Sequence, residues 1–109
     1  MLDLFLDQIQ EACFFIKDTD YRFVTGNAAL VRILGASSLD EIIGKTDLDF
    51  TADFLASTFR DDDRAVLEDG KALFNKMELV PTTETLEWRC TTKVPLYDMQ
   101  DRIIALAGM

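Results

Sequence analysis

The segment from Glu84 to Asp98 reads ETLEWRCTTKVPLYD and is the longest stretch of the chain in which two kinds of side chain alternate. Alternate positions carry Trp88 and Cys90 in one set and Arg89 and Lys93 in the other. Because successive side chains of an extended strand point to opposite faces, this period of two predicts a strand with two chemically different faces. The face that turns inward decides what the protein can bind.

Further strands are predicted on both sides of a helical block, at residues 12–17, 22–26, 73–80 and 103–107. Residues 18–20 form a turn cluster between the first two strands, and Pro81 ends the third. In the segment quoted above, Pro95 followed by Asp98 marks the end of strand pairing, since proline cannot donate to a ladder. Strands that flank a helical block indicate one antiparallel sheet with helices on one face, which is an α+β domain.

Helices are predicted from apolar spacing and from the residues at their ends. Asn27 caps a helix that Gly35 ends, because asparagine accepts hydrogen bonds at the first turn and glycine adopts the left-handed conformation that closes the last. Ser38 followed by Glu41 has the form of a capping box and opens a short helical piece. The central helix spans residues 55–69, with Phe59, Asp63, Val66 and Leu67 at helical spacing. A short amphipathic helix is expected within residues 1–11, with Leu2, Phe5, Leu6 and Ile9 on its apolar face.

Composition narrows the class of protein. The 109 residues suit one domain, and a hydrophobic fraction of 49% suffices for a packed core. No apolar run reaches the roughly 18 residues that a membrane span needs. The net charge of −9 and the scattered basic residues argue against direct nucleic-acid binding, which needs clustered lysine and arginine. Residues 1–10 lack the features of a signal peptide, so a cytoplasmic location is expected.

The residue types present exclude several kinds of site. No histidine occurs, which rules out histidine-ligated haem and catalysis by Ser-His-Asp or Cys-His groups. Cys13 and Cys90 are too few for a disulfide scaffold and, without histidine, for a zinc site. The acidic run at 61–63, flanked by Arg60 and Arg64, is typical of a solvated helix face. Neither a metal site nor a catalytic residue is predicted.

Five short motifs occur in the order and spacing of the PAS domain, in its bacterial sensory-box form. They are FIKD at 15–18 with Asn27, LG at 34–35, EIIGKTD at 41–47, DRAVLEDG at 63–70 and TKVPLYD at 92–98. The chain resembles that family over residues 12–109. The resemblance implies a five-stranded antiparallel sheet of strand order 2-1-5-4-3, with short helices packed over one face around a small-molecule pocket.

Two positions depart from the family pattern. Tyr21 and Asp101 stand in hairpin turns where family members usually carry glycine. Tyrosine tolerates a positive φ poorly, so the first turn is expected to be distorted or of another type. The implied strand order places Cys13 and Cys90 about 10 Å apart, two strand spacings, which implies free thiols. The helix after Asn27 lacks the cysteine of photoactive flavin domains, so no cysteinyl–flavin adduct is expected, and the identity of any cofactor stays unknown.

The resemblance also chooses between two interpretations of the segment quoted first. Polarity alone would turn Trp88 and Cys90 toward the core, whereas similarity to flavin-binding members turns the opposite face inward. The ligand-binding residues then predicted are Phe15, Lys17, Asn75, Met77, Leu79, Arg89, Thr91 and Lys93. Other residues expected to point inward are Leu73, Ile103, Ala105 and Ala107. The outer face, covered by the N-terminal helix and serving as the dimer contact, comprises Leu2, Phe5, Leu6, Ile9, Phe14, Ile16, Trp88, Cys90, Ile104 and Leu106.

This arrangement brings Lys17, Arg89 and Lys93 to one cavity, where an unpaired cation would be costly. One hypothesis is that they hold an anionic metabolite, with Thr91 and Asn75 as neutral hydrogen-bonding groups. The alternative is that the side chains run along the pocket rim and their charges reach Glu or Asp side chains at the surface.

The sequence therefore predicts a non-catalytic sensory module that forms a homodimer, binds a small molecule in its core and signals through dimer geometry. Its effector domain is expected beyond this chain, in a histidine kinase, a cyclic-dinucleotide enzyme or a transcription factor. The alternative is a ligand-free PAS dimerisation module, in which Phe59, Phe74 and Met77 fill the cavity.

Overall fold

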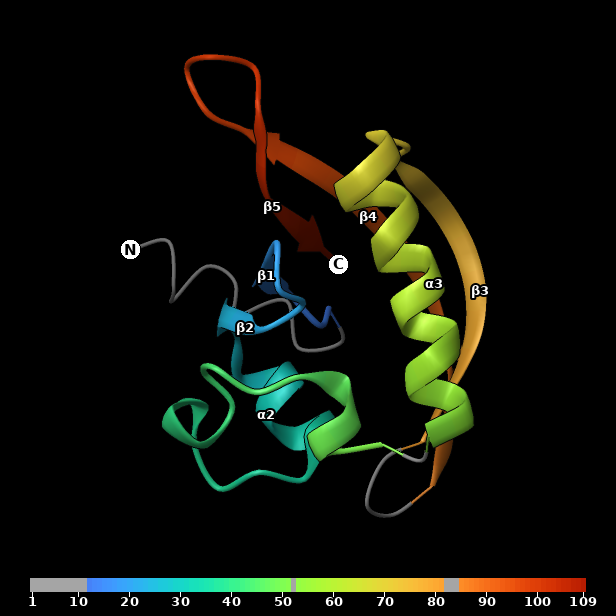
Figure 1. Cartoon of the computed structure of the whole chain (residues 1–109). Helices are drawn as coiled ribbons and strands as arrows, with labels where there is room; N and C mark the ends of the chain where they lie inside the picture. The colour runs from blue at the N-terminus through green and yellow to red at the C-terminus, as the bar shows by residue number, and fades with distance from the viewer. Residues whose placement is uncertain (1–11, 52, 82–84) are drawn as a thin grey trace.

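The computed structural model describes residues 12–51, 53–81 and 85–109 (Figure 1). The helix predicted within residues 1–11, with Leu2, Phe5, Leu6 and Ile9, lies outside the described residues. Five antiparallel strands form one sheet in the order β2-β1-β5-β4-β3, which confirms the predicted α+β fold and strand order. The strands are β1 (Phe15–Asp18), β2 (Phe23–Gly26), β3 (Leu73–Pro81), β4 (Leu86–Tyr97) and β5 (Ile103–Gly108).

Helices cover one face of the sheet, and the core lies between the two layers. The helical elements are α2 (Ala28–Leu34), η1 (Leu39–Glu41), η2 (Asp47–Asp49) and α3 (Asp53–Asp69). Figure 1 shows α3 running along β3 and β4, with α2 near β2. One buried cluster joins Phe23 of β2 to Leu30 of α2 and to Ile42, and a second joins Val66 of α3 to Leu106 of β5. No described helix is long and apolar enough to cross a membrane.

The residues at the helix ends show which of the predicted helix caps form. Asn27 caps α2 as predicted, because its Oδ1 accepts from the backbone N–H of Leu30 at 3.2 Å, and Gly35 ends the helix with φ of 72°. The capping box predicted at Ser38 does not form. The Ser38 side chain makes no cap hydrogen bond, and the carboxylate of Glu41 accepts instead from the N–H of Ser37.

The two hairpin turns without glycine have the same geometry, so the expected difference at Tyr21 is wrong. Tyr21 and Asp101 adopt φ of 65° and 60°. In each turn an aspartate, Asp18 or Asp98, accepts two backbone N–H groups through its Oδ1. The guanidinium of Arg60 also lies 4.3 Å from the centre of the Tyr21 ring. These contacts offset the cost of a positive φ for a tyrosine.

A β-bulge in β3 changes which of its side chains face inward. Leu73 lies opposite Lys93, but the pairing then shifts, so that Glu78 lies opposite Arg89. The shift coincides with Asn75, whose φ is 54°. Because one extra residue reverses every later side chain, the predicted inward positions of Met77 and Leu79 are wrong. Both side chains are on the outer face, 59% and 39% exposed.

The inward residues of β5 also differ from the prediction. Leu106 was expected on the outer face, but it is fully buried against α3 and lies opposite Lys17 of β1. Ala107 lies opposite Ile16, and Ala105 lies opposite Asp18, so both alanines share the outer face and not the inner one. The register between β4 and β5 shifts at Leu96 and Tyr97, and for that reason counting from Ile103 gave the wrong phase.

The three hydrogen bonds of Asn27 generate a prediction about stability. Its amide caps α2, accepts from the N–H of Phe14 at 3.1 Å and donates to the carbonyl of Ala12 at 2.8 Å. Asn27→Ala should lower the free energy of unfolding by about 2 kcal/mol, measured by urea denaturation. Ser38→Ala is the matched control and should change it by less than about 0.5 kcal/mol. Equal effects of the two substitutions would contradict this account.

Candidate ligand-binding site

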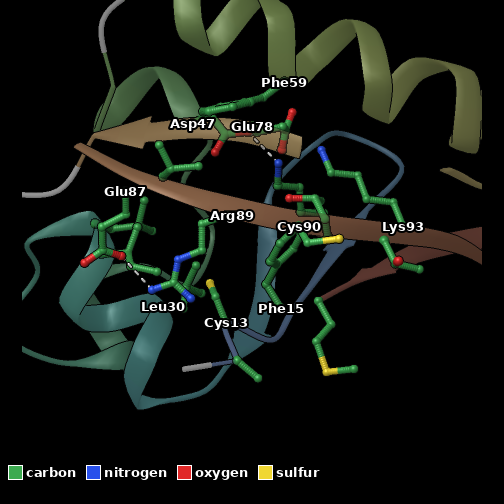
Figure 2. A pocket seen from close by; sticks show the side chains of 18 of the residues that line it. Cys13, Phe15, Leu30, Asp47, Phe59, Glu78, Glu87, Arg89, Cys90 and Lys93 are labelled. Carbon is green, nitrogen blue, oxygen red and sulfur yellow. Dashed lines mark hydrogen bonds and ion pairs between the residues drawn. The ribbon is translucent and has the colours of Figure 1, made fainter. Parts of the chain in front are cut away.

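A cavity of about 820 Å³ lies between the inner face of the sheet and the helices (Figure 2). This volume is within the range of about 300–1,000 Å³ found for small-molecule sites. The elements around it are β1, β2, β3, β4, α2, η2 and α3. Its apolar walls are formed by Phe15, Phe23, Leu30, Ile33 and Phe59. Phe15 and Phe23 meet edge to face, with ring centres 6.0 Å apart.

A cluster of buried charges lies on the wall between β1, β4 and α3. Lys17 of β1 is 2% exposed, and its Nζ donates to Asp63 Oδ2 at 2.6 Å and to Asp47 Oδ2 at 2.5 Å. Lys93 of β4 donates from Nζ to the other oxygen of Asp63 at 2.7 Å. Asp63 of α3 therefore accepts from lysines on two strands. Each ammonium group also lies near aromatic rings, Lys17 near Phe15 and Phe23, and Lys93 near Phe15 and Phe59.

The pKa directions within this cluster show that the ion pairs outweigh burial. Burial alone would lower the pKa of Lys17, but Asp47 and Asp63 raise it above its usual 10.5. Burial would likewise raise the pKa of Asp63, but Lys17 and Lys93 hold it below its usual 3.8. Lys17 and Asp63 are therefore charged at neutral pH.

A second group of charges connects β4 to α2 beside the cavity. Arg89 donates to Glu87 at 2.7 Å, and Arg32 of α2 donates to the other carboxylate oxygen of Glu87 at 3.3 Å. Figure 2 shows Arg89 and Glu87 joined by a dashed line on the side of the cavity next to α2. Glu87 therefore links the strand to the helix.

Six of the eight predicted ligand-binding residues line the cavity: Phe15, Lys17, Asn75, Arg89, Thr91 and Lys93. Met77 and Leu79 do not, because of the bulge in β3. That the six contact a ligand stays a prediction. On the outer face, Trp88 is 69% exposed, and Cys90 and Ile104 are also exposed, while Phe14 and Ile16 are half-buried. Trp88 and Cys90 also border the cavity.

Sequence reasoning missed the carboxylates of the site. The expectation of a solvated acidic run is wrong for Asp63, which is fully buried. The available signal was its helical spacing with Phe59, Val66 and Leu67, which belong to the inward face of α3. Because Asp47, Asp63 and Glu87 pair with the cavity cations, those cations do not require an anionic ligand. The surface pairing considered as the alternative occurs largely inside the protein.

Other reactive groups are few in the part of the chain that the structure describes. No cluster of three or more metal-ligating side chains occurs there. Cys13 and Cys90 are free. Burial raises the pKa of the Cys13 thiol to about 11, so this thiol, which lines the cavity, stays protonated and is a poor nucleophile.

Comparisons with known proteins agree with this architecture. The family model described as the PAS fold matches residues 6–109, and the chain belongs to the PAS family. The solved structure of the VqmA–ligand–DNA complex from Vibrio cholerae is similar, with a TM-score of 0.79 and 25% identity over 94% of this chain and 48% of that chain. The chain thus spans about half the length of VqmA. No curated protein matches the sequence.

Two further structures share the fold at lower identity. The PAS domain of BvgS from Bordetella pertussis has a TM-score of 0.77 and 16% identity, over 98% of this chain and 79% of that chain. A sensory-box sensor histidine kinase from Vibrio cholerae has a TM-score of 0.70 and 16% identity, over 96% of this chain and 86% of that chain.

The buried charge cluster generates a prediction for Asp63. Asp63→Asn should lower the free energy of unfolding at pH 7 by about 3 kcal/mol, because two buried ammonium groups lose their shared carboxylate. Asp61→Asn, on the exposed side of the same helix, is the matched control and should change it by less than about 0.5 kcal/mol.

The same pair of variants can be compared as the pH falls, by urea denaturation at pH 7 and pH 3. The pKa of Asp63 is lower in the folded protein than its usual value of 3.8, so the unfolded chain takes up this proton at a higher pH than the folded protein does. The stabilisation from Asp63 is therefore complete above pH 3.8 and is lost as the pH falls through the folded-state pKa. The deficit of Asp63→Asn should therefore shrink at pH 3. A deficit that is absent at pH 7 would show that the cluster does not stabilise the fold.

Proposed function

We propose that this PAS domain is a non-catalytic sensory module that binds a small organic molecule between its sheet and its helices. The observation that carries the proposal is the cavity of about 820 Å³, with aromatic walls and a few polar groups. The similarity to VqmA supports it, since solved structures of that protein include a ligand–DNA complex and a complex with DPO. In this proposal Phe15, Lys17, Asn75, Arg89, Thr91 and Lys93 contact the ligand.

The proposed ligand is not an anion held by lysine. A carboxylate entering beside Lys17 and Lys93 would meet Asp47 and Asp63, which already occupy these ammonium groups at 2.5–2.7 Å. Displacing them would leave buried carboxylates without their partners. The anionic metabolite suggested by the sequence is therefore replaced by a ligand that leaves this cluster intact.

Signalling is proposed to pass through a homodimer to an effector domain outside these residues, such as a kinase, a cyclic-dinucleotide enzyme or a transcription factor. A ligand shifts such a dimer only if it binds one arrangement of sheet and helices more tightly than another. The proposed contact is the outer face of the sheet, where Leu86, Trp88, Met77 and Leu79 are exposed apolar side chains on paired strands. A VqmA dimer has been solved, which supports a dimer for this chain.

The competing function is a ligand-free dimerisation module. It required Phe59, Phe74 and Met77 to fill the cavity. Phe74 and Met77 are 66% and 59% exposed, and neither lines the cavity. Of the three, Phe59 alone borders the cavity. These side chains therefore do not fill it, which favours the ligand-binding function.

Mass spectrometry of small molecules extracted from the purified protein tests ligand binding. A specific compound should be retained by the wild type and lost in Thr91→Phe, whose larger side chain would project into the cavity and obstruct the ligand. Met77→Phe places the same ring on the outer face and should retain it. Repeated recovery of no compound from wild-type protein, whether made in its source cells or exposed to their extract, would favour the dimerisation module.

Dimer formation can be tested separately by light scattering. Trp88→Glu should weaken a homodimer at least about tenfold, because it places a charge at the centre of the apolar outer face. Met99→Glu makes the same kind of change at an exposed residue of the β4–β5 turn and should leave association unchanged. A dimer equally stable in both variants would exclude the outer face as the contact.

A further inference from the structure

Glu78 of β3 is a buried carboxylate inside the proposed ligand cavity. Its side chain is 8% exposed and lines the cavity. Figure 2 shows it among the cavity-lining side chains. Its Oε1 atom is buried and has no hydrogen-bond partner among the described residues. A buried acceptor without a donor is costly and is uncommon in folded proteins.

The cations near Glu78 are already engaged by other carboxylates. Lys76 Nζ lies 3.6 Å from Glu78 Oε1, too far for a hydrogen bond, and it donates to Asp62 at 2.6 Å. Arg89 lies opposite Glu78 in the sheet, but its guanidinium donates to Glu87 at 2.7 Å. In the described part of the chain, the ammonium group of Lys76 therefore attracts the carboxylate of Glu78, but no donor lies at hydrogen-bonding distance from Oε1.

The other ion pairs around the cavity also leave Glu78 without a close partner. Lys17 and Lys93 are balanced by Asp47 and Asp63, Arg89 by Glu87, and Lys76 by Asp62. Each of these cations therefore lies closer to another carboxylate than to Glu78. The net charge of −9 adds a general attraction for cations.

We propose that Glu78 is the anchor for a protonated nitrogen of the ligand, and that the cavity takes a small amine with an aromatic or other apolar body. The ammonium group would donate to Glu78 Oε1, and the apolar body would lie against Phe15, Phe59 and Leu30, which line the same cavity. This assignment rests on the proposed ligand-binding function and adds the chemical class of the ligand. It also makes Glu78 a residue that determines ligand specificity. The sequence analysis placed Met77 and Leu79 in the cavity, and with that phase of β3 the side chain of Glu78 would have pointed outward.

Three probes of the same size test the assignment: benzylamine, which is cationic at neutral pH, benzyl alcohol, which is neutral, and benzoate, which is an anion. Binding to the wild type is measured by NMR titration of the backbone amides around the cavity. Benzylamine should bind at least about tenfold more tightly than benzyl alcohol, and benzoate should bind most weakly. Glu78→Gln keeps the shape of the side chain, so it should remove this preference for benzylamine while changing the affinity for benzyl alcohol by less than about threefold.

Glu68→Gln, which removes one negative charge from an exposed position of α3, is the matched control and should keep the preference. Equal binding of benzylamine and benzyl alcohol to the wild type would overturn the role of Glu78 while supporting a ligand cavity. An equal loss of the preference in Glu68→Gln and Glu78→Gln would also overturn it, because the effect would then come from the general charge. Binding of none of the three probes would overturn the amine class, while the extraction experiment above would decide separately whether the cavity holds a ligand.

Discussion

The shared carboxylate of Asp63 is the interaction on which the arrangement of the two layers depends. Its two oxygens accept from Lys17 of β1 and Lys93 of β4, strands that are separated in the sheet by β5. A single group on α3 is thereby held across three strands. Apolar contacts between Val66, Leu106 and their neighbours stabilise the same layers, but such contacts are not directional. The charged hydrogen bonds add a fixed position of the helix relative to the strands.

This arrangement also explains how the cavity can carry cations on its wall and still be stable without a bound anion. Lys17 and Lys93 have their carboxylates within the chain and face aromatic rings on their other sides. In the proposed function, recognition of a ligand would therefore fall to groups whose hydrogen bonds are incomplete. Glu78, on the neighbouring strand β3, is such a group.

The sequence predicted the fold because local patterns defined most strands and helices, and the resemblance to the PAS family supplied the strand order. The alternation in β4 defined two faces, and the family resemblance, against the polarity of the side chains, placed Arg89 and Lys93 at the cavity and Trp88 outside it, where the structure has them. Asn27 and Gly35 stand at the two ends of α2 as expected. The predictions failed where a strand changed its phase. No feature of the sequence around Asn75 predicts the β-bulge there, and none predicts the register shift between β4 and β5 near Leu96. Burial of Asp63 depends on lysines that are distant in sequence, so composition alone favoured a solvated position.

Asn27 has a consequence for how the cavity is connected to the start of the sheet. Its one amide group holds the carbonyl of Ala12, the N–H of Phe14 and the first turn of α2 together. Leu30 and Ile33 of that helix are part of the cavity wall. A displacement of α2 would therefore strain the hydrogen bonds that Asn27 makes to Ala12 and Phe14, just before β1. One side-chain amide thus connects the wall of the cavity to the segment that leads into β1.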